Sequence, residues 1–293
     1  MPLIIDVVAP GYGGKPEDIA AVAHYLKKLG FTARIPEDIF SSNLLHSHDD
    51  AYRISHLLKA LKAKDSAAVW CFKGGYGTAK LIPALSKITP PARFKPLIGF
   101  SDITALHLFM NQQWKWPTLH GPVLWQLIHG KVGDTSAEKL KALLLGEAKV
   151  DFALTPINKA ARDFSGTGKI TGGNLALLQT SIGSVWQAKA RGKFLLIEEV
   201  DEQAYRIDRM LLHLAQAKIL DGVKAVLFGD FTFANASEEE RKIQAVLEIF
   251  AAESKLPVFR LPGIGHAAQN DPIPFGTKAT IAKNRLRVDG FLS

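Results

Sequence analysis

Short apolar runs alternate with amphipathic helical patterns along the first 125 residues of the chain. The apolar runs, at residues 3–9, 31–35, 67–72 and 96–98, predict buried strands. The helical patterns lie at residues 16–29, 51–63, 78–85 and 103–114. Strands that alternate with helices indicate a parallel sheet covered on both faces, with a ligand site beyond the carboxyl ends of its strands. We therefore predict an N-terminal parallel-sheet α/β domain over residues 1–125.

The hydrophobic pattern weakens after residue 130 and resumes near residue 166, so residues 126–166 are predicted to connect two domains. Beyond them, the pattern predicts helices at 175–182, 209–217 and 237–252, and strands at 194–197, 225–228 and 258–259. A hairpin of strands 279–281 and 286–288 is expected to turn at Asn284. Residues 167–293 are therefore predicted to form a smaller, mixed α/β C-terminal domain.

Length and composition agree with two globular domains. The chain has 293 residues, 47% of them hydrophobic, which is enough for two ordinary cores. No apolar stretch approaches the roughly 20 residues of a membrane span, and the first residues lack the pattern of a signal peptide. We therefore expect a cytoplasmic protein that has no membrane partner. The single cysteine, Cys71, lies in an apolar run and is expected to be a buried thiol.

The net charge of +8 raises the question of a nucleic-acid partner. In the sequence the basic residues are spread along helical patterns, such as residues 25–28 and 57–62, which is typical of solvated helix faces. We therefore expect no nucleic-acid partner, although a basic surface would suit a small acidic substrate.

Ser101 is the first candidate for chemistry. It follows the strand at 96–98 and precedes a helical pattern, which is the setting of a nucleophile elbow. The second glycine of the usual G-x-S-x-G elbow is replaced by Ile103. Ser101 and Asp102 would also serve as an ordinary helix cap. The local pattern alone leaves both interpretations open.

The glycine-rich segment 74–77 follows another predicted strand end. A loop with so little side-chain bulk can present backbone amides to an oxyanion or a phosphate, or it can simply form a tight turn. The chain contains no G-x-x-x-x-G-K-[ST] motif, and no G-x-G-x-x-G motif that an acidic residue follows about 20 positions later. A nucleotide-binding loop is therefore not favoured.

A nucleophilic serine needs a base and an acid that orients the base, and sequence spacing does not restrict where these lie. The candidates are His266, in a glycine-bracketed loop, and a carboxylate directly after the strand at 194–197. Each could equally be an ordinary surface residue. A second polar group, at His46, His48, Asp49 and Asp50, lacks a recognised zinc spacing and is interpreted as a solvated loop and helix start.

Taken together, six motifs resemble the L,D-carboxypeptidase family of serine peptidases, and they keep the family's order over nearly the whole chain. They are Gly74–Gly77, Gly99–Thr104, His120–Pro122, Gly172–Leu175, the segment Leu196–Glu199 with Tyr205–Leu211, and Gly265–His266. Several matched segments in order are far more specific than any one of them.

The resemblance implies a catalytic triad of Ser101, Glu198 and His266, with Glu199 on the opposite face of its strand. It also implies an oxyanion hole formed by backbone amides of Gly74, Gly75 and Asp102. Three residues are expected to bind substrate: Lys73, which stands where much of the family has arginine, Tyr76 and His120, the last of which could instead be structural.

The implied activity is removal of the terminal D-alanine from a murein tetrapeptide during peptidoglycan recycling, by a homodimer that needs no metal or organic cofactor. One alternative within the family is a hydrolase of the microcin C self-immunity type, which cuts peptidyl or aminoacyl nucleotides with the same triad. A non-catalytic binding module on an α/β scaffold is a second alternative, and a nucleic-acid binder is a third.

Overall fold

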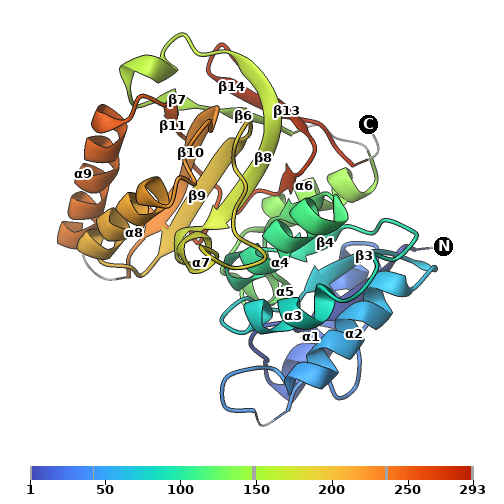
Figure 1. The fold of residues 1–293 in the computed structure, drawn as a ribbon. Coiled ribbons are helices and arrows are strands. Elements are labelled where there is room, and N and C mark those ends of the chain that lie inside the picture. Colours follow the sequence, from blue (N-terminus) through green and yellow to red (C-terminus); the bar gives the residue numbers. More distant parts are fainter. Residues whose placement is uncertain (1, 42, 147–149, 235–236, 292–293) are drawn as a thin grey trace.

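The structure is a computed structural model that describes residues 2–41, 43–146, 150–234 and 237–291. Two sheets organise it, one in each half of the chain (Figure 1). The fold is mixed α/β, as the sequence predicts. Among the described residues, no helix is both long and apolar enough to cross a membrane.

The first sheet has six strands in the order β12-β5-β4-β3-β1-β2. Its strands are β1 (Ile4–Val8), β2 (Thr32–Arg34), β3 (Ser66–Cys71), β4 (Leu97–Gly99), β5 (Thr118–His120) and β12 (Ile273–Phe275). All neighbours pair in parallel except β12, which pairs antiparallel with β5 at the edge. The parallel strands end at the same edge of the sheet, where Ser101 follows β4 and the glycine-rich turn follows β3.

Short helices connect and cover these strands. They are α1 (Pro16–Lys28), α2 (Asp50–Lys62), α3 (Ile82–Leu85), α4 (Thr104–Phe109), α5 (Leu124–Ile128) and α6 (Asp134–Leu144). Proline at the first position and two acidic residues in the first turn favour the start of α1 where the sequence predicts it. The helix predicted at 78–85 begins as a 3-10 turn (Thr78–Leu81), and a π-turn (Met110–Trp114) extends α4.

The second sheet has eight strands in the order β6-β14-β13-β8-β9-β10-β11-β7. They are β6 (Val150–Ala153), β7 (Thr155–Pro156), β8 (Gly166–Asn174), β9 (Phe194–Val200), β10 (Ala225–Thr232), β11 (Val258–Arg260), β13 (Lys278–Ala282) and β14 (Arg285–Val288). Strands β8 to β11 are parallel and the others antiparallel. Helices α7 (Leu175–Thr180), α8 (Ala204–Gln216) and α9 (Ser237–Glu253) accompany the parallel strands.

Two segments do not follow the division of the chain into an N-terminal and a C-terminal half. Strand β12 comes from the C-terminal part but completes the first sheet beside β5. The segment 126–166 contains α6, whose Leu140 and Leu143 join the core of the first half, and β6 and β7, which pair within the second sheet. The chain therefore crosses between the halves more than once.

The two halves meet along a shared hydrophobic core. Leu106 and Phe109 of α4, Leu178 of α7 and Ile197 of β9 belong to one buried cluster. Figure 1 shows α4 and α7 where the blue-green half meets the yellow-orange half. The helix that follows Ser101 is thus packed directly against the half that carries Glu198.

Candidate active site

Ser101 lies on a strained turn between β4 and α4. Its φ of 61° lies in the left-handed region. This conformation costs free energy in a residue other than glycine, and residues held in it are concentrated at functional sites. A Cβ on Gly99 would lie 2.9 Å from Cγ1 of Ile103. Ile103 therefore packs where Gly99 has no side chain, which explains how the elbow tolerates isoleucine in place of its second glycine.

The glycine-rich turn after β3 lies directly against Ser101. A Cβ on Gly74 would lie 3.0 Å from Cβ and 3.3 Å from Oγ of Ser101. The Gly74 carbonyl accepts a hydrogen bond from the Tyr12 amide at 2.8 Å, and the Tyr12 ring covers Gly75. The backbone of this turn is therefore close enough to the serine for its amides to face a developing oxyanion.

Asp102 ties the turn to the elbow. Its buried carboxylate accepts a hydrogen bond from the Thr78 amide at 2.9 Å, and the Thr78 hydroxyl donates to the Asp102 carbonyl. Burial raises the pKa of Asp102 against the opposing effect of these hydrogen bonds. The Asp102 side chain thus holds the glycine-rich turn against the elbow, and the Asp102 backbone lies next to Ser101.

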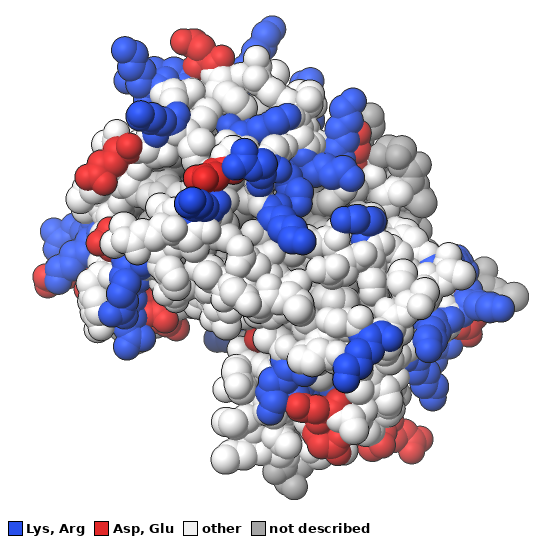
Figure 2. Space-filling view, viewed as in Figure 1, with Lys and Arg blue, Asp and Glu red and all other residues white. Residues whose placement is uncertain are grey.

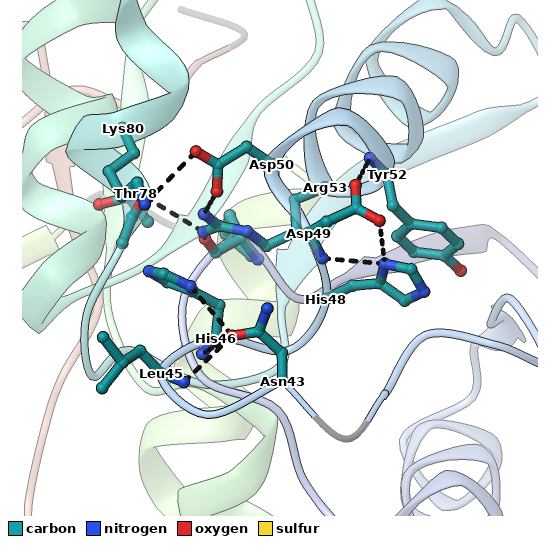
Figure 3. Close-up of polar contacts among 12 residues, drawn as sticks. Asn43, Leu45, His46, His48, Asp49, Asp50, Tyr52, Arg53, Thr78 and Lys80 are labelled. Carbon is teal, nitrogen blue, oxygen red and sulfur yellow. Dashed lines mark hydrogen bonds and ion pairs between the residues drawn. The ribbon is translucent and has the colours of Figure 1, made fainter.

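Arg53 of α2 supports the same turn from behind. Its fully buried guanidinium donates to the carbonyls of Pro10 and Gly77 and pairs with Asp50 at 2.5 Å (Figure 3). Arg53 is not among the residues predicted from the sequence. A signal was present, because residues 53, 57, 60 and 61 form one face of α2 and the other three are apolar.

Glu198 and His266 are hydrogen-bonded beside the elbow. Nδ1 of His266 lies 2.8 Å from Oε2 of Glu198, which is fully buried on β9. The Phe100 ring, next to Ser101 in the chain, lies 4.5 Å from the His266 imidazole, centroid to centroid. The structure therefore places Glu198 and His266 in direct contact, with the residue next to Ser101 packed against the His266 ring.

The partners of this pair set its protonation. Burial acts to raise the pKa of Glu198, but His266 and His120 outweigh burial and hold the pKa at about 2. Burial likewise acts to lower the pKa of His266, and the facing Glu198 carboxylate raises it above its ordinary value instead. A carboxylate that stays ionised keeps the imidazole oriented and able to take up a proton.

Glu199 points to the other side of β9. Its carboxylate accepts hydrogen bonds from Asn174 Nδ2 at 2.7 Å, the Ala176 amide at 2.8 Å and the Val200 amide at 2.9 Å. Burial and the neighbouring charge of Glu198 raise its pKa to about 7. Strand alternation thus separates one carboxylate that faces His266 from another that braces the start of α7.

The three expected substrate-binding residues differ in exposure. Tyr76 is half exposed, and its ring stacks on His46 at 5.4 Å. Lys73 lies over the Trp125 ring, 4.2 Å from its centre, and burial lowers the pKa of its ammonium. His120 has no exposed surface and lies 4.0 Å from Glu198. The expected contact of His120 with substrate is therefore not supported by its position, because other side chains cover it completely.

The polar side chains at residues 46–50 pair with neighbouring residues (Figure 3). His48 pairs with Asp49 at 3.1 Å, Asp50 pairs with Arg53, and His46 lies 3.2 Å from Asn43 Oδ1. Within the described ranges, no group of three or more His, Cys, Asp or Glu side chains has an arrangement that could hold a metal ion. His46 differs from the expected solvated residue, because it is buried against Tyr76 and Gly77.

Two family models match this chain: the LD-carboxypeptidase N-terminal domain over residues 5–121 and the LD-carboxypeptidase C-terminal domain over residues 167–281. The chain belongs to the LD-carboxypeptidase family. Ser101 lies within the first matched segment, and Glu198 and His266 lie within the second.

Individual relatives agree with the family. A Rickettsia conorii protein named as a carboxypeptidase is 38% identical over 288 residues, which cover 96% of this chain and 88% of that protein. The murein tetrapeptide carboxypeptidase of Pseudomonas aeruginosa is 31% identical over 242 residues, which cover 80% of this chain and 78% of that protein.

Solved structures share the fold of this LD-carboxypeptidase family member over nearly all of the chain. The muramoyltetrapeptide carboxypeptidase of Oxalobacter formigenes superposes with a TM-score of 0.83 at 22% identity and covers 97% of both chains. An MccF-like protein of Bacillus anthracis gives a TM-score of 0.84 at 20% identity, over 99% of this chain and 97% of the other. At these identities the likeness concerns the fold.

Proposed function

We propose that this protein is a serine L,D-carboxypeptidase that removes the terminal D-alanine from murein tetrapeptides in cytoplasmic peptidoglycan recycling. The observation that carries the proposal is the 2.8 Å contact between His266 and Glu198 beside a serine held at positive φ. Membership of the LD-carboxypeptidase family and the murein tetrapeptide carboxypeptidase of Pseudomonas aeruginosa support the choice of substrate.

In the proposed mechanism, His266 takes the proton from Ser101 Oγ, which attacks the carbonyl of the bond between the L-centre and D-alanine. Backbone amides of Gly74, Gly75 and Asp102 stabilise the negative charge that develops on the carbonyl oxygen. His266 then protonates the departing amine of D-alanine, and a water molecule hydrolyses the acyl-enzyme. Glu198 stays ionised, orients the imidazole and stabilises its cation.

Lys73 and Tyr76 are proposed to bind the substrate. The Lys73 ammonium suits a carboxylate of the muropeptide, and the half-exposed Tyr76 ring offers an apolar surface next to the turn. A homodimer and domain limits at residues 1–125 and 167–293, with 126–166 as the connection, stay predictions.

The test is to incubate the protein with a murein tetrapeptide and with its all-L counterpart, and to measure released alanine by mass spectrometry. We expect D-alanine from the tetrapeptide alone, and a loss of about 10⁴–10⁶-fold in kcat in Ser101→Ala and in His266→Ala. Circular dichroism spectra and melting curves would check that both variants stay folded. Near-normal turnover by either variant would contradict the proposed triad.

A hydrolase of peptidyl or aminoacyl nucleotides is the second candidate. It is favoured by the similarity to the microcin C7 self-immunity protein MccF of Escherichia coli, which is 25% identical over 71% of this chain. The discriminating experiment offers an aminoacyl sulfamoyl adenosine beside the murein tetrapeptide. Cleavage of the nucleotide conjugate alone, abolished by Ser101→Ala, would replace the first proposal with this one.

A further inference from the structure

A second histidine lies against the carboxylate that holds His266. Nε2 of His120 lies 4.0 Å from Oε1 of Glu198, and both side chains are fully buried. Neither of these two atoms has a hydrogen-bond partner among the described residues, whereas Oε2 of Glu198 is bonded to His266. Leaving a buried carboxylate oxygen and a buried ring nitrogen unpaired is costly, and here each faces the other.

The chemistry of the two groups fixes the direction of this contact. An ionised carboxylate only accepts hydrogen bonds, so the ring nitrogen that faces Oε1 must carry a hydrogen. Hydrogen bonds in catalytic sites are often long without substrate and shorten when it binds. We propose that His120 is a positioning residue that donates its Nε2 hydrogen to Glu198 and holds this carboxylate in register with His266.

The surroundings of His120 prevent its ring from turning elsewhere. The ring lies 5.3 Å from that of Phe275 on β12 and 5.8 Å from that of Phe100 beside Ser101, between ring centres. Its backbone is paired on both sides, with Gly99 of β4 and Ile273 of β12. A ring fixed in this way can act on Glu198 but cannot reach a substrate.

His120 lies between the strand that precedes Ser101 and the strand that carries Glu198. Ser101 follows β4 of the first sheet, whereas Glu198 belongs to β9 of the second sheet. His120 is paired with Gly99, two residues before the serine, and faces Glu198 across the junction. It therefore fixes the acid of the triad relative to the strand that carries the nucleophile.

Several titratable groups besides His120 surround Glu198. His266 also faces Glu198, and the charge of Glu198 acts on Glu199, on the opposite side of the same strand, and on Asp230 of β10. His107 of α4 lies 6.2 Å from the His120 ring, between ring centres. Loss of the His120 donor makes the Glu198 carboxylate more basic, so His266 holds its proton more tightly. The acidic limb of the activity profile therefore moves to higher pH.

The test compares His120→Phe, which keeps a ring but removes the donor, with His120→Gln, whose side-chain amide can donate. Phe259→Leu removes a fully buried ring that packs on Phe164 of the second half of the chain, and it serves as the control for lost aromatic packing. The readout is the rate of Ser101 labelling by a fluorophosphonate probe as a function of pH, together with kcat and KM for the tetrapeptide.

We expect His120→Phe to slow labelling and kcat by roughly 10–100-fold, with KM within about twofold, because a small misplacement of a catalytic group costs about this much. The acidic limb should shift to higher pH, and His120→Gln and Phe259→Leu should stay close to wild type. Labelling of His120→Phe at the wild-type rate with the same pH profile would overturn the proposal, as would a Gln variant as slow as the Phe variant.

A measurement on the unaltered protein covers the case in which His120→Phe does not fold. In ¹⁵N NMR spectra at pH 7, the Nε2 of His120 should carry a hydrogen, and a hydrogen-free Nε2 would refute the inference. The inference rests on the proposed function, but probe labelling and NMR do not need the murein substrate. Failure of D-alanine release together with a slowed His120→Phe would reject the substrate and leave the role of His120 standing.

Discussion

Adjacent carboxylates on β9 differ in ionisation because their partners differ. Glu198 faces two histidines and has a pKa of about 2, whereas Glu199 faces N–H donors and the charge of Glu198, and its pKa rises to about 7. A buried carboxyl group whose pKa is raised on folding binds its proton more tightly in the folded protein. Glu199 therefore links the stability of the junction between β9 and α7 to pH.

The sign of this linkage follows from the two pKa values of Glu199. Below its ordinary pKa of 4.5 the group is protonated in both states, and above about 7 it is ionised in both. Between these values the folded state binds more protons, so the free energy of unfolding falls as pH rises. We expect the wild type to lose up to about 3 kcal/mol relative to Glu199→Gln between pH 4.5 and pH 7, at about 1.4 kcal/mol per pKa unit.

Urea unfolding at several pH values would measure this difference. The exposed Glu17→Gln in α1 serves as a control, since it removes an acid without altering a buried group. A difference between wild type and Glu199→Gln that is the same at pH 5 and pH 8 would show that Glu199 keeps an ordinary pKa.

At the scale of single residues, the sequence yields candidates for the proposed triad but not their arrangement. Ser101 and His266 stand out by their position after a strand or in a glycine-bracketed loop, whereas the choice of Glu198 over Glu199 rests on the resemblance to the family. The pairing of Glu198 with His266 joins residues 68 positions apart, and no local pattern encodes it. The motif around His120 suggests a substrate contact because it lies near the site, but the burial of His120 depends on β12, a three-residue strand with no pattern of its own.

Among the elements, β8 and α4 approach each other closely at the junction of the halves. Gly173 of β8 has a φ of 125°, and a Cβ there would overlap Oγ1 of Thr104, the first residue of α4. Thr104 Oγ1 accepts a hydrogen bond from the Asn174 amide at 3.1 Å. The end of β8 is therefore fitted to the helix that follows Ser101.

We predict that Gly173→Ala is much more destabilising than an alanine at a comparable glycine elsewhere. Gly183 has a φ of 79°, and a Cβ added there would meet no heavy atom within 4 Å, so Gly183→Ala should cost only the backbone strain of about 1–2 kcal/mol. Gly173→Ala adds a collision with α4 and should cost about 2–5 kcal/mol in all, since overpacking adds about 1–3 kcal/mol to the backbone strain. Equal midpoints of urea unfolding for the two variants would contradict the close fit.

The elements themselves could be predicted where their apolar pattern is long. Strands β1, β3, β9 and β10 and helices α1, α2 and α9 lie where the sequence places them, within a few residues. Helix α8 begins at Ala204 rather than 209, because exposed Tyr205 and Arg206 hide the apolar spacing of its first turn. The short strands β5 and β12 escape prediction, since three residues cannot display a period.

Across the whole molecule, the fold creates a concentration of positive charge that the sequence does not show. Figure 2 shows Lys and Arg side chains gathered in the middle of one face, over β8 and β13. Lys115, Lys169 and Lys193 come from three separate segments and line a cavity of about 210 Å³. The basic residues look evenly spread along the chain because residues up to 78 positions apart become neighbours only after folding.

The ammonium of Lys193 is destabilised by burial and by the neighbouring lysines. This half-buried ammonium donates to the Lys189 carbonyl at 2.7 Å. Burial lowers its pKa first, and repulsion from Lys115, Lys169 and Lys189 lowers it further. A lysine whose pKa is lowered on folding disfavours the folded state while it is protonated, and that penalty is relieved as pH rises toward 10.5. Dissolved salt relieves the part that comes from repulsion.

We therefore expect Lys193→Gln to raise the melting temperature by about 1–3 °C at low ionic strength, where roughly 1 kcal/mol corresponds to 2–4 °C in a protein of this size. Added sodium chloride should raise the melting temperature of the wild type more than that of Lys193→Gln, since the variant has less repulsion left to screen. Lys27→Gln, on an exposed position of α1, removes the same charge away from the cluster and should leave the salt dependence unchanged. If Lys27→Gln and Lys193→Gln respond to salt alike, the effect belongs to the net charge of +8 and not to the arrangement of these four lysines.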